Sequence, residues 1–324
     1  MYTKKTDGLL LNVNTAPSTA YTGYTTNFAT IQNKGLEFEI KGGIVRSKNF
    51  SWTSAFNIAR NLSKLTDVNV DLFENPSQPE DPNYGVYIMG NSVVKKGEPL
   101  GLLYGYVTKG VLKTTADVEA YKAKLSPFYA QYFWPGLGVG DIQYELDDSG
   151  SPKRDVIGSA APKFFGGFNN TFSYKNLSLS ALFTFSYGNQ LIYGDDNNDM
   201  KFDNAANRGK RMLGRYTAQN PNADRPRLIY QRFTPVSDMN VFDASYIKLK
   251  SITLSYNLPA SLLQKIRMRN IAVYLSGYNL LTITNYPGND PETTNDPYST
   301  VGGYIDVSNY APVKTYTLGV RVGF

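Results

Sequence analysis

The clearest pattern in the chain is a strict alternation of apolar and polar residues over positions 313–324. One face of this segment carries the apolar side chains of Tyr316, Leu318, Val320, Val322 and Phe324. The opposite face carries Thr315, Thr317, Gly319, Arg321 and Gly323. A period of two over this length predicts a β-strand with one apolar and one polar face.

Two kinds of protein use such a strand differently. In a soluble sandwich, the apolar face packs against a second sheet. In an outer-membrane barrel, the apolar face contacts lipid, aromatic side chains mark the two interfaces, and the polar face lines a wet lumen. The predicted hairpin 163–187 repeats the alternation and concentrates aromatic residues at the ends of its apolar stripes. The pattern therefore favours barrel strands.

Strand character recurs along the whole chain, and the first strand is partial at residues 2–12. The other predicted strands cover residues 35–43, 50–62, 85–94, 100–111, 163–174, 177–187, 246–256, 271–282 and 313–324. Helical character is seen at 115–125, with Thr115 or Asp117 as the candidate N-cap, and in a basic connection at 259–269.

The connections between these strands alternate in length. Short ones fall at 46–49, 95–98, 175–176 and 258–269, and long ones at 63–84, 112–162, 188–245 and 285–312. Barrels of the outer membrane have short periplasmic turns and long extracellular loops. Nothing in the architecture of a soluble sandwich requires every long loop to lie at one end. The alternation of short and long connections is therefore the best topological argument for a barrel.

The predicted strands do not make a closed barrel by themselves. The count is about nine complete strands plus a partial one, whereas single-chain bacterial barrels have an even number. A sheet edge open to lipid would leave backbone groups unpaired, at several kcal/mol each. We therefore expect an all-β, antiparallel transmembrane barrel of which residues 1–324 form the C-terminal part, with the remaining strands in a preceding segment or another chain.

Composition narrows the function classes. The chain has no Cys and no His, which removes disulfides, thiolate metal sites and the commonest general base, and argues against an enzyme. A net charge of +6 without a basic block argues against nucleic-acid binding. No apolar run reaches the ~18 residues that a membrane helix needs. The first residues lack the apolar core of a signal peptide, so we expect an exported barrel to need residues before Met1.

Five segments resemble, in order, the C-terminal half of the SusC-like group of TonB-dependent outer-membrane transporters, the RagA/SusC family. The most specific is VYLSGYNLLTITNYPGNDPE at 273–292, followed by SYIKLKSITLSYNLP at 245–259. The others are NKGLEFEI at 33–40, GEPLGLLYGY at 97–106 and APKFFGGFNNTFSYKNLSLS at 161–180. The resemblance covers essentially the whole chain.

The resemblance implies a 22-stranded barrel blocked by an N-terminal plug, in the outer membrane of a Gram-negative bacterium with its long loops extracellular. It also implies a SusD-like surface lipoprotein as a lid, and energy from TonB, which grips a segment near the N-terminus. We expect that segment, the plug and the early strands to lie outside this chain. The resemblance implies no cofactor.

One departure from the family concerns a calcium-like loop that many relatives carry before the PKF strand. Here the loop reads GDIQYELDDSGSPKRD at 140–155. Asp147, Asp148 and Ser149 offer oxygen ligands, but the regular D-x-[DN]-x-[DN]-G spacing is broken. A solvated turn is favoured over a bound cation, and no metal site is predicted.

Two other acidic groups invite similar scrutiny. The run DDNND at 195–199 suggests oxygen ligands, but a polar loop tip is the favoured interpretation. Glu37 and Glu39 share one strand face and resemble a paired-carboxylate site, yet Lys41 beside them favours ordinary charges facing the lumen.

An aromatic cluster before Pro135 is the one candidate contact site. It consists of Tyr129, Tyr132, Phe133 and Trp134. Exposed aromatic rings stack on sugar rings or anchor a partner protein, whereas packing within the loop itself is the alternative. We expect contact with the lid lipoprotein before contact with substrate.

The leading hypothesis is import of glycans or peptides across the outer membrane, with this chain as barrel wall, lumen lining and docking loops. One alternative is a soluble or surface-exposed all-β binding module, and another is a passive porin. The sequence does not distinguish glycan from peptide, because loops set the substrate.

Overall fold

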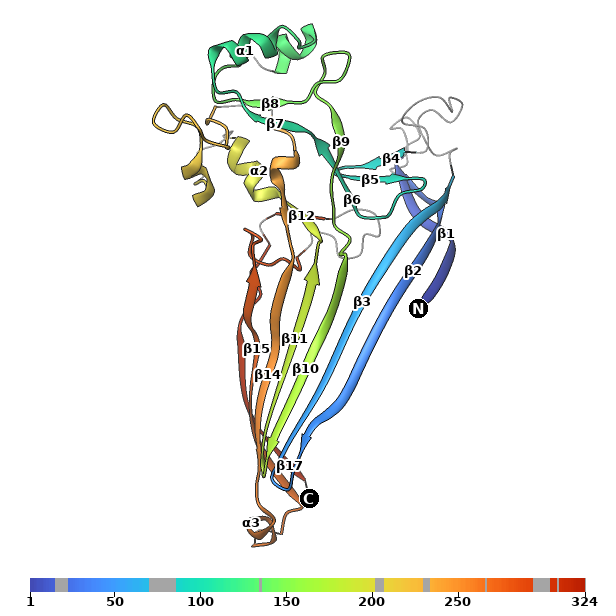
Figure 1. Ribbon diagram of the computed structural model, residues 1–324, viewed down its shortest axis with the longest axis vertical. Coiled ribbons are helices and arrows are strands. Elements are labelled where there is room, and N and C mark those ends of the chain that lie inside the picture. Colours follow the sequence, from blue (N-terminus) through green and yellow to red (C-terminus); the bar gives the residue numbers. More distant parts are fainter. Residues whose placement is uncertain are drawn as a thin grey trace.

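The computed structural model describes residues 1–14, 23–69, 86–133, 136–201, 207–229, 234–265, 267–293, 304–307 and 309–323. One large antiparallel sheet carries smaller sheets and helices at one end (Figure 1). Within the described part of the chain, none of the helices combines the length and apolar character needed to cross a bilayer.

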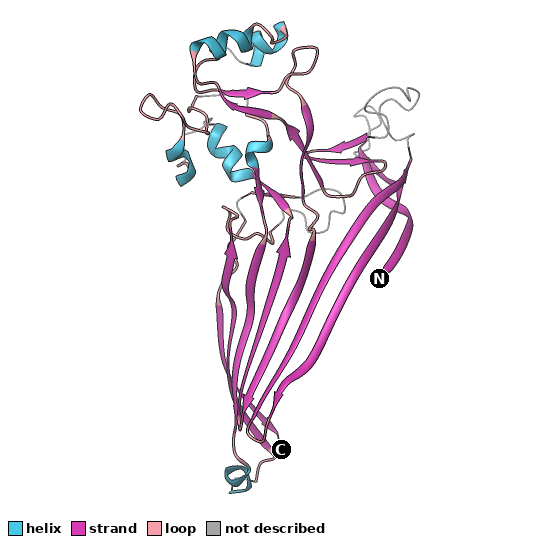
Figure 2. Cartoon of the chain, viewed as in Figure 1, coloured by secondary structure: helices cyan, strands magenta, loops and turns pink. Residues whose placement is uncertain are grey.

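The large sheet, called the wall below, has eight strands in the order β1-β2-β3-β10-β11-β14-β15-β17. Their bounds are Tyr2–Asn14, Gly23–Arg46, Phe50–Val68, Phe164–Tyr174, Leu177–Tyr187, Tyr246–Asn257, Asn270–Thr284 and Thr315–Gly323. Each strand pairs antiparallel with the wall strand that precedes it along the chain, so the predicted up-and-down order is confirmed. Strands β2, β3, β10, β11, β14 and β15 stay side by side down to the narrow lower end (Figure 2), whereas β1 pairs only with the first part of β2.

Short and long connections lie at opposite ends of the wall, as the alternation predicted. At the lower end, β10 turns into β11 through two residues, and Lys175 adopts a positive φ of 52° there. The helix α3 (Ala260–Lys265) joins β14 to β15 at the same end (Figure 1). All described small sheets lie at the upper end, so every long excursion leaves and re-enters the wall on that side.

The register sorts side chains from distant segments into rows across the wall. Cross-strand partners share a face, and one row reads Ile40, Phe56, Phe168, Phe183, Leu249 and Leu281. A second apolar row reads Val45, Trp52, Phe172, Leu179, Leu254, Leu275 and Leu318. The row between them on the opposite face is polar, with Thr53, Thr171, Ser180, Thr253, Ser276 and Thr317. The wall therefore has an apolar face and a polar face.

The apolar face is uncovered. Ile40 is 59% exposed, Leu318 74% and Leu275 50%. A soluble sandwich would bury these side chains against a second sheet, and the described residues supply none. The buried clusters of the chain lie elsewhere, chiefly around Leu112, Tyr121 and Tyr144 in the upper layer.

The upper layer contains three small sheets and two helices. The strands are β4 (Val86–Met89), β5 (Ser92–Lys95), β6 (Leu102–Tyr106) and β9 (Arg154–Ser159); β7 (Thr108–Val111) and β8 (Ile142–Tyr144); and β12 (Gln190–Tyr193), β13 (Val241–Asp243) and β16 (Ile305–Asp306). The helices are α1 (Thr115–Lys122) and α2 (Gly194–Lys201). This layer stands directly over the upper strand ends (Figure 1).

Two details differ from the sequence prediction. The strands expected at 85–94 and 100–111 are four short strands of the upper layer, because Val93, Val94 and Leu103 are buried in its packing instead of facing outward. The wall thus has eight strands, against the expected nine plus a partial one. β2 also begins at Gly23, well before residue 35, where the predicted strand starts.

The predicted helix is confirmed as α1, with Thr114 and not Thr115 or Asp117 as its N-cap. The Thr114 hydroxyl accepts a hydrogen bond from the Asp117 amide, and the Asp117 carboxylate accepts one from the Thr114 amide. This reciprocal capping satisfies two otherwise unpaired N–H groups.

Gly166 is required because the neighbouring strand leaves no room for a side chain at this position. A Cβ at this position would lie 2.1 Å from the Asn57 carbonyl oxygen of the neighbouring strand and 2.7 Å from the Phe185 ring. Gly166→Ala in the whole protein is expected to lower the free energy of unfolding by about 1–3 kcal/mol. Gly42→Ala, in the same sheet but with nothing within 4 Å of its Cβ, is the control. Denaturant unfolding in detergent measures both, and equal effects would contradict the packing argument.

Candidate functional site

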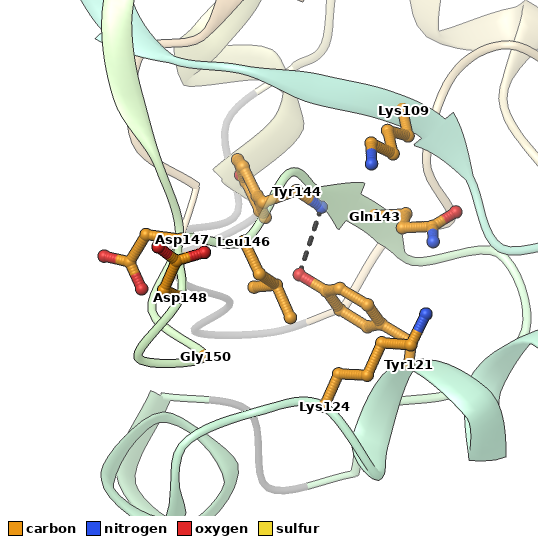
Figure 3. A pocket seen from close by; sticks show the side chains of 9 residues that line it. All are labelled: Lys109, Tyr121, Lys124, Gln143, Tyr144, Leu146, Asp147, Asp148 and Gly150. Carbon is orange, nitrogen blue, oxygen red and sulfur yellow. Dashed lines mark hydrogen bonds between the residues drawn. The ribbon is translucent and has the colours of Figure 1, made fainter.

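A cavity of about 410 Å³ lies in the upper layer between α1, β8 and the turn after β8 (Figure 3). Its lining residues are Lys109, Tyr121, Lys124, Gln143, Tyr144, Leu146, Asp147, Asp148 and Gly150. The volume is in the range of small-molecule sites. Polar and charged side chains dominate the lining, so the cavity suits a hydrophilic molecule.

The rear of the cavity is fixed by two buried tyrosines. Tyr121 projects from α1, and its hydroxyl accepts a hydrogen bond from the Tyr144 amide at 3.1 Å (Figure 3). Burial raises the pKa of Tyr121, so its hydroxyl stays protonated at neutral pH. This bond ties the helix to β8 and holds the cavity open.

Charges of both signs flank the opening. Lys109 and Lys124 lie on one side and Asp147 and Asp148 on the other (Figure 3). Neither lysine ammonium forms an ion pair with any described residue. The Asp147 carboxylate accepts hydrogen bonds from the Ser149 amide and hydroxyl and from the Ser151 amide, which hold its pKa below the ordinary value.

The loop that resembled a calcium site is therefore a self-bonded turn. One oxygen of Asp147 is committed to three donors of Ser149 and Ser151. No cluster of three or more acidic residues within the described ranges is arranged to hold a metal ion. The run 195–199 is not a polar loop tip, because it lies in α2 and buries Asp196.

The predicted aromatic contact site is only partly within the described residues. Tyr129 is half-buried, packs against the buried cluster around Leu112, and meets Phe128 edge-on with ring centroids 5.5 Å apart. Tyr132 and Phe133 lie in the helical turn Tyr129–Phe133, but their side chains are outside the description. Trp134 lies outside the described residues altogether.

Glu37, Glu39 and Lys41 lie on the polar face of β2, opposite the row that contains Ile40. Their register partners are Ala59, Asn57 and Ala55 on β3. All three charged side chains are exposed. The placement agrees with charges lining a polar lumen.

Sequence reasoning missed a buried ionic cluster on the same face. Lys248 of β14 is 1% exposed, and its ammonium contacts Asp290 at 2.5 Å and Glu292 at 2.6 Å. Lys250 contacts Glu292 at 2.5 Å, and the Tyr246 hydroxyl donates to Glu292 at 2.7 Å. The sequence does contain the residues of this cluster, as Lys-x-Lys at 248–250 on one strand and Asp-Pro-Glu at 290–292 after the next. Only the tertiary structure shows that the two motifs pair with each other.

This cluster fixes the loop that follows β15 to the wall. Burial raises the pKa of Glu292, but hydrogen bonds from Lys248, Lys250 and Tyr246 outweigh it and leave the pKa below its ordinary value. Further along, the Tyr286 hydroxyl donates to Asp306 at 2.8 Å. The mouth of the polar face is thus bounded by a firmly attached loop.

Three further ion pairs organise the excursion between β11 and β14. Asp196 of α2 is buried and contacts Arg225 at 2.7 Å and Arg211 at 3.1 Å. Arg227 contacts the buried Asp141 at 2.8 Å, and the hydrogen bonds that the guanidinium donates to this carboxylate raise the pKa of Arg227. Asp141 belongs to the preceding excursion, so this pair joins two loops far apart in sequence.

Comparison with known proteins gives a consistent result. The chain is 33% identical over its whole length to TonB-dependent receptor P3 of Formosa agariphila, covering 32% of that protein. It is 23% identical to TonB-dependent receptor SusC of Bacteroides thetaiotaomicron, over 90% of this chain and 27% of that one. The chain thus spans about a third of the length of the curated relatives that it matches. No protein-family model matches.

The fold matches that of a solved transporter. A structure described as the RagAB peptide transporter superposes with a TM-score of 0.74 over 99% of this chain and 32% of that chain, at 23% identity. A further structure, described as the RagAB peptide importer in the open-open state, gives a TM-score of 0.69. The wall is therefore a sector of the barrel seen in these structures.

Lys248 and Lys250 offer a matched pair for testing the ionic cluster. Lys248→Ala is expected to cost up to about 3–5 kcal/mol, because it removes the buried ammonium that pairs with Asp290 and with Glu292. Lys250→Ala, at a partly exposed side chain, is expected to cost no more than about 1 kcal/mol. Denaturant unfolding of the whole protein measures both values. Hydrogen exchange of residues 285–293 should accelerate only for Lys248→Ala, and a similar cost for both variants would refute the burial argument.

Acid is expected to release the same loop. Because the folded-state pKa of Glu292 lies below its ordinary value of 4.5, its contribution to stability is fully present above that pH. The contribution is lost as the pH falls through the folded-state pKa. Hydrogen exchange of residues 285–293 between pH 6 and pH 3 should show this loss, and Glu292→Gln should remove the pH dependence. Persistence of the full pH dependence in Glu292→Gln would assign it to another group.

Proposed function

The chain belongs to the SusC-like TonB-dependent receptors, and on this premise we propose that residues 1–324 form the C-terminal part of a 22-stranded, plugged outer-membrane barrel that imports glycans or peptides. The chain supplies wall, lumen lining and extracellular loops. The plug and the earlier strands belong to the part of the receptor outside this chain.

The main support for the proposal is the division of the wall into an apolar and a polar face. The rows through Ile40 and Leu318 need an apolar surround, and the opposite face with Glu37, Glu39 and Lys41 needs water. A soluble binding module would leave the apolar rows in water, which is unfavourable. The similarity of the chain to receptors and transporters, and not to enzymes, supports a transport role.

The upper layer is the proposed docking surface for a SusD-like lipoprotein, which would close the mouth as a lid. Tyr129, Tyr132, Phe133 and Trp134 are proposed contacts with this lid or with substrate. The charged cavity between Lys109 and Asp148 supports a hydrophilic substrate. TonB would act through the N-terminal portion of the receptor.

The lipid-facing assignment can be tested on β2 with one substitution on each face. Ile40→Arg puts a charge on the apolar face and is expected to cost about 2–4 kcal/mol, the value for Arg near the bilayer midplane. Glu39→Arg puts the same side chain on the polar face and is expected to stay within about 1 kcal/mol. Unfolding of the full-length receptor in lipid vesicles measures both. Equal costs would show that lipid does not touch Ile40.

Energy dependence separates active import from a passive porin. Cells that express the full-length receptor and its lid are expected to take up labelled peptide or glycan only with TonB present and the proton gradient intact. Replacing Tyr129, Tyr132, Phe133 and Trp134 together by Ala should lower uptake at least fivefold while receptor abundance stays constant. TonB-independent uptake would favour the porin, and unchanged uptake in the Ala variant would remove the aromatic cluster from the site.

A further inference from the structure

A second cleft, of about 310 Å³, opens at the upper end of the wall where β10, β11, β14 and β15 lie next to one another (Figure 1). Its lining residues are Phe164, Phe185, Ser186, Tyr187, Asp243, Ser245, Tyr246, Ile247, Ile283, Thr284 and Asn285. Unlike the charged cavity of the upper layer, most of this lining is apolar. It is a site of a different chemical kind.

The register assigns the cleft to the apolar face. Phe185 is the cross-strand partner of Ile247, and Ile247 is the partner of Ile283. These three side chains lie on the same face as the row through Phe183 and Leu249, two residues nearer the loops. The cleft is therefore continuous with the surface that contacts lipid, and is separated by the wall from the polar lumen.

The walls of the cleft are rigid rings and exposed aliphatic groups. Phe164 stacks on Tyr187 with centroids 4.8 Å apart and meets Phe185 edge-on at 6.4 Å. Ile247 and Ile283 are 50% and 59% exposed, although they line a concave site. Paired rings hold their shape without a ligand, so the cleft is formed in advance for an extended apolar group.

The rim toward the loops is polar. The Ser245 hydroxyl donates a hydrogen bond to Asp243 and accepts one from the Gly188 amide at 2.9 Å. Asp243 is the charged residue of this rim, and its carboxylate already accepts the Ser245 hydroxyl. The polar groups of the rim are therefore already hydrogen-bonded to one another.

We propose that this cleft holds one acyl chain of a lipid from the membrane leaflet at the loop end of the wall. The assignment rests on the proposed membrane orientation. A bilayer lipid is favoured over transported substrate because the cleft lies on the lipid face. It is favoured over the acyl anchor of a lipoprotein because the lining continues directly into the bilayer-facing rows.

The test is lipid retention by the full-length receptor, purified without lipoprotein, in native mass spectrometry with added palmitoyl-oleoyl phosphatidylethanolamine. One lipid is expected to bind more tightly than all others. Ile283→Trp fills the cleft and should weaken this first binding event at least tenfold. Leu254→Trp adds the same ring to the same face lower on β14, where Leu254 is 41% exposed, and should change it less than twofold.

Palmitoyl-oleoyl glycerol, which has the same chains and no phosphate, should bind within about twofold of phosphatidylethanolamine, because the lining contacts the acyl chain and not the headgroup. Equal retention in the Ile283→Trp and Leu254→Trp receptors would overturn the site. Preferential binding of a diacylated lipopeptide over the phospholipid would overturn the choice of occupant.

Thermal unfolding and substrate uptake are measured separately, so that a loss of lipid binding can be distinguished from a loss of folding or of transport. Both Trp variants should unfold at the temperature of the unmodified receptor, because each replaces an exposed side chain, and Ile283→Phe provides a smaller filling variant. Substrate uptake is measured in parallel. Normal uptake with no retained lipid would reject this inference alone, whereas loss of the lipid-facing preference at Ile40 would reject the proposed barrel.

Discussion

The continuous ladder of backbone hydrogen bonds across the eight wall strands is the constraint on which the structure depends. A strand in hydrocarbon has no water to satisfy its N–H and C=O groups, so every neighbour must be in register. That register then decides which side chain faces lipid and which faces the lumen, because a slip of one residue would exchange the two faces. Side chains from β2 to β17 form coherent rows only because six successive pairings agree.

An irregularity between β11 and β14 shows how strictly the faces are kept. Ser251 pairs with Leu182 and Leu249 pairs with Phe183, which leaves Lys250 as an extra residue on β14. Before the shift, Ile247 and Leu249 face outward; after it, Ile252 and Leu254 do. A regular strand would have turned one of these two pairs toward the lumen. The bulge therefore resets an apolar pattern whose period changes in mid-strand.

The upper layer is stabilised by different interactions from those of the wall. Its strands are short, and it is held by small buried clusters and by ion pairs between loops, such as Asp141 with Arg227 and Asp196 with Arg225. Buried charges of this kind are costly unless they are paired and hydrogen-bonded, so they specify one arrangement of the loops.

The sequence alone determined the strand pattern, the two faces, the helix at 115–125 and the alternation of short turns with long loops. Each of these follows from local periodicity and turn residues, which need no tertiary partner. It also carried the family resemblance, through segments such as 273–292.

Tertiary structure decided the rest. The segments 85–94 and 100–111 look like wall strands, yet only their packing around Val94 and Leu103 places them in the upper layer. The burial of Lys248 and Asp196 depends on partners 42 and 29 residues away along the chain. Neither cavity is visible in the sequence, because both arise where strands and loops distant in sequence meet.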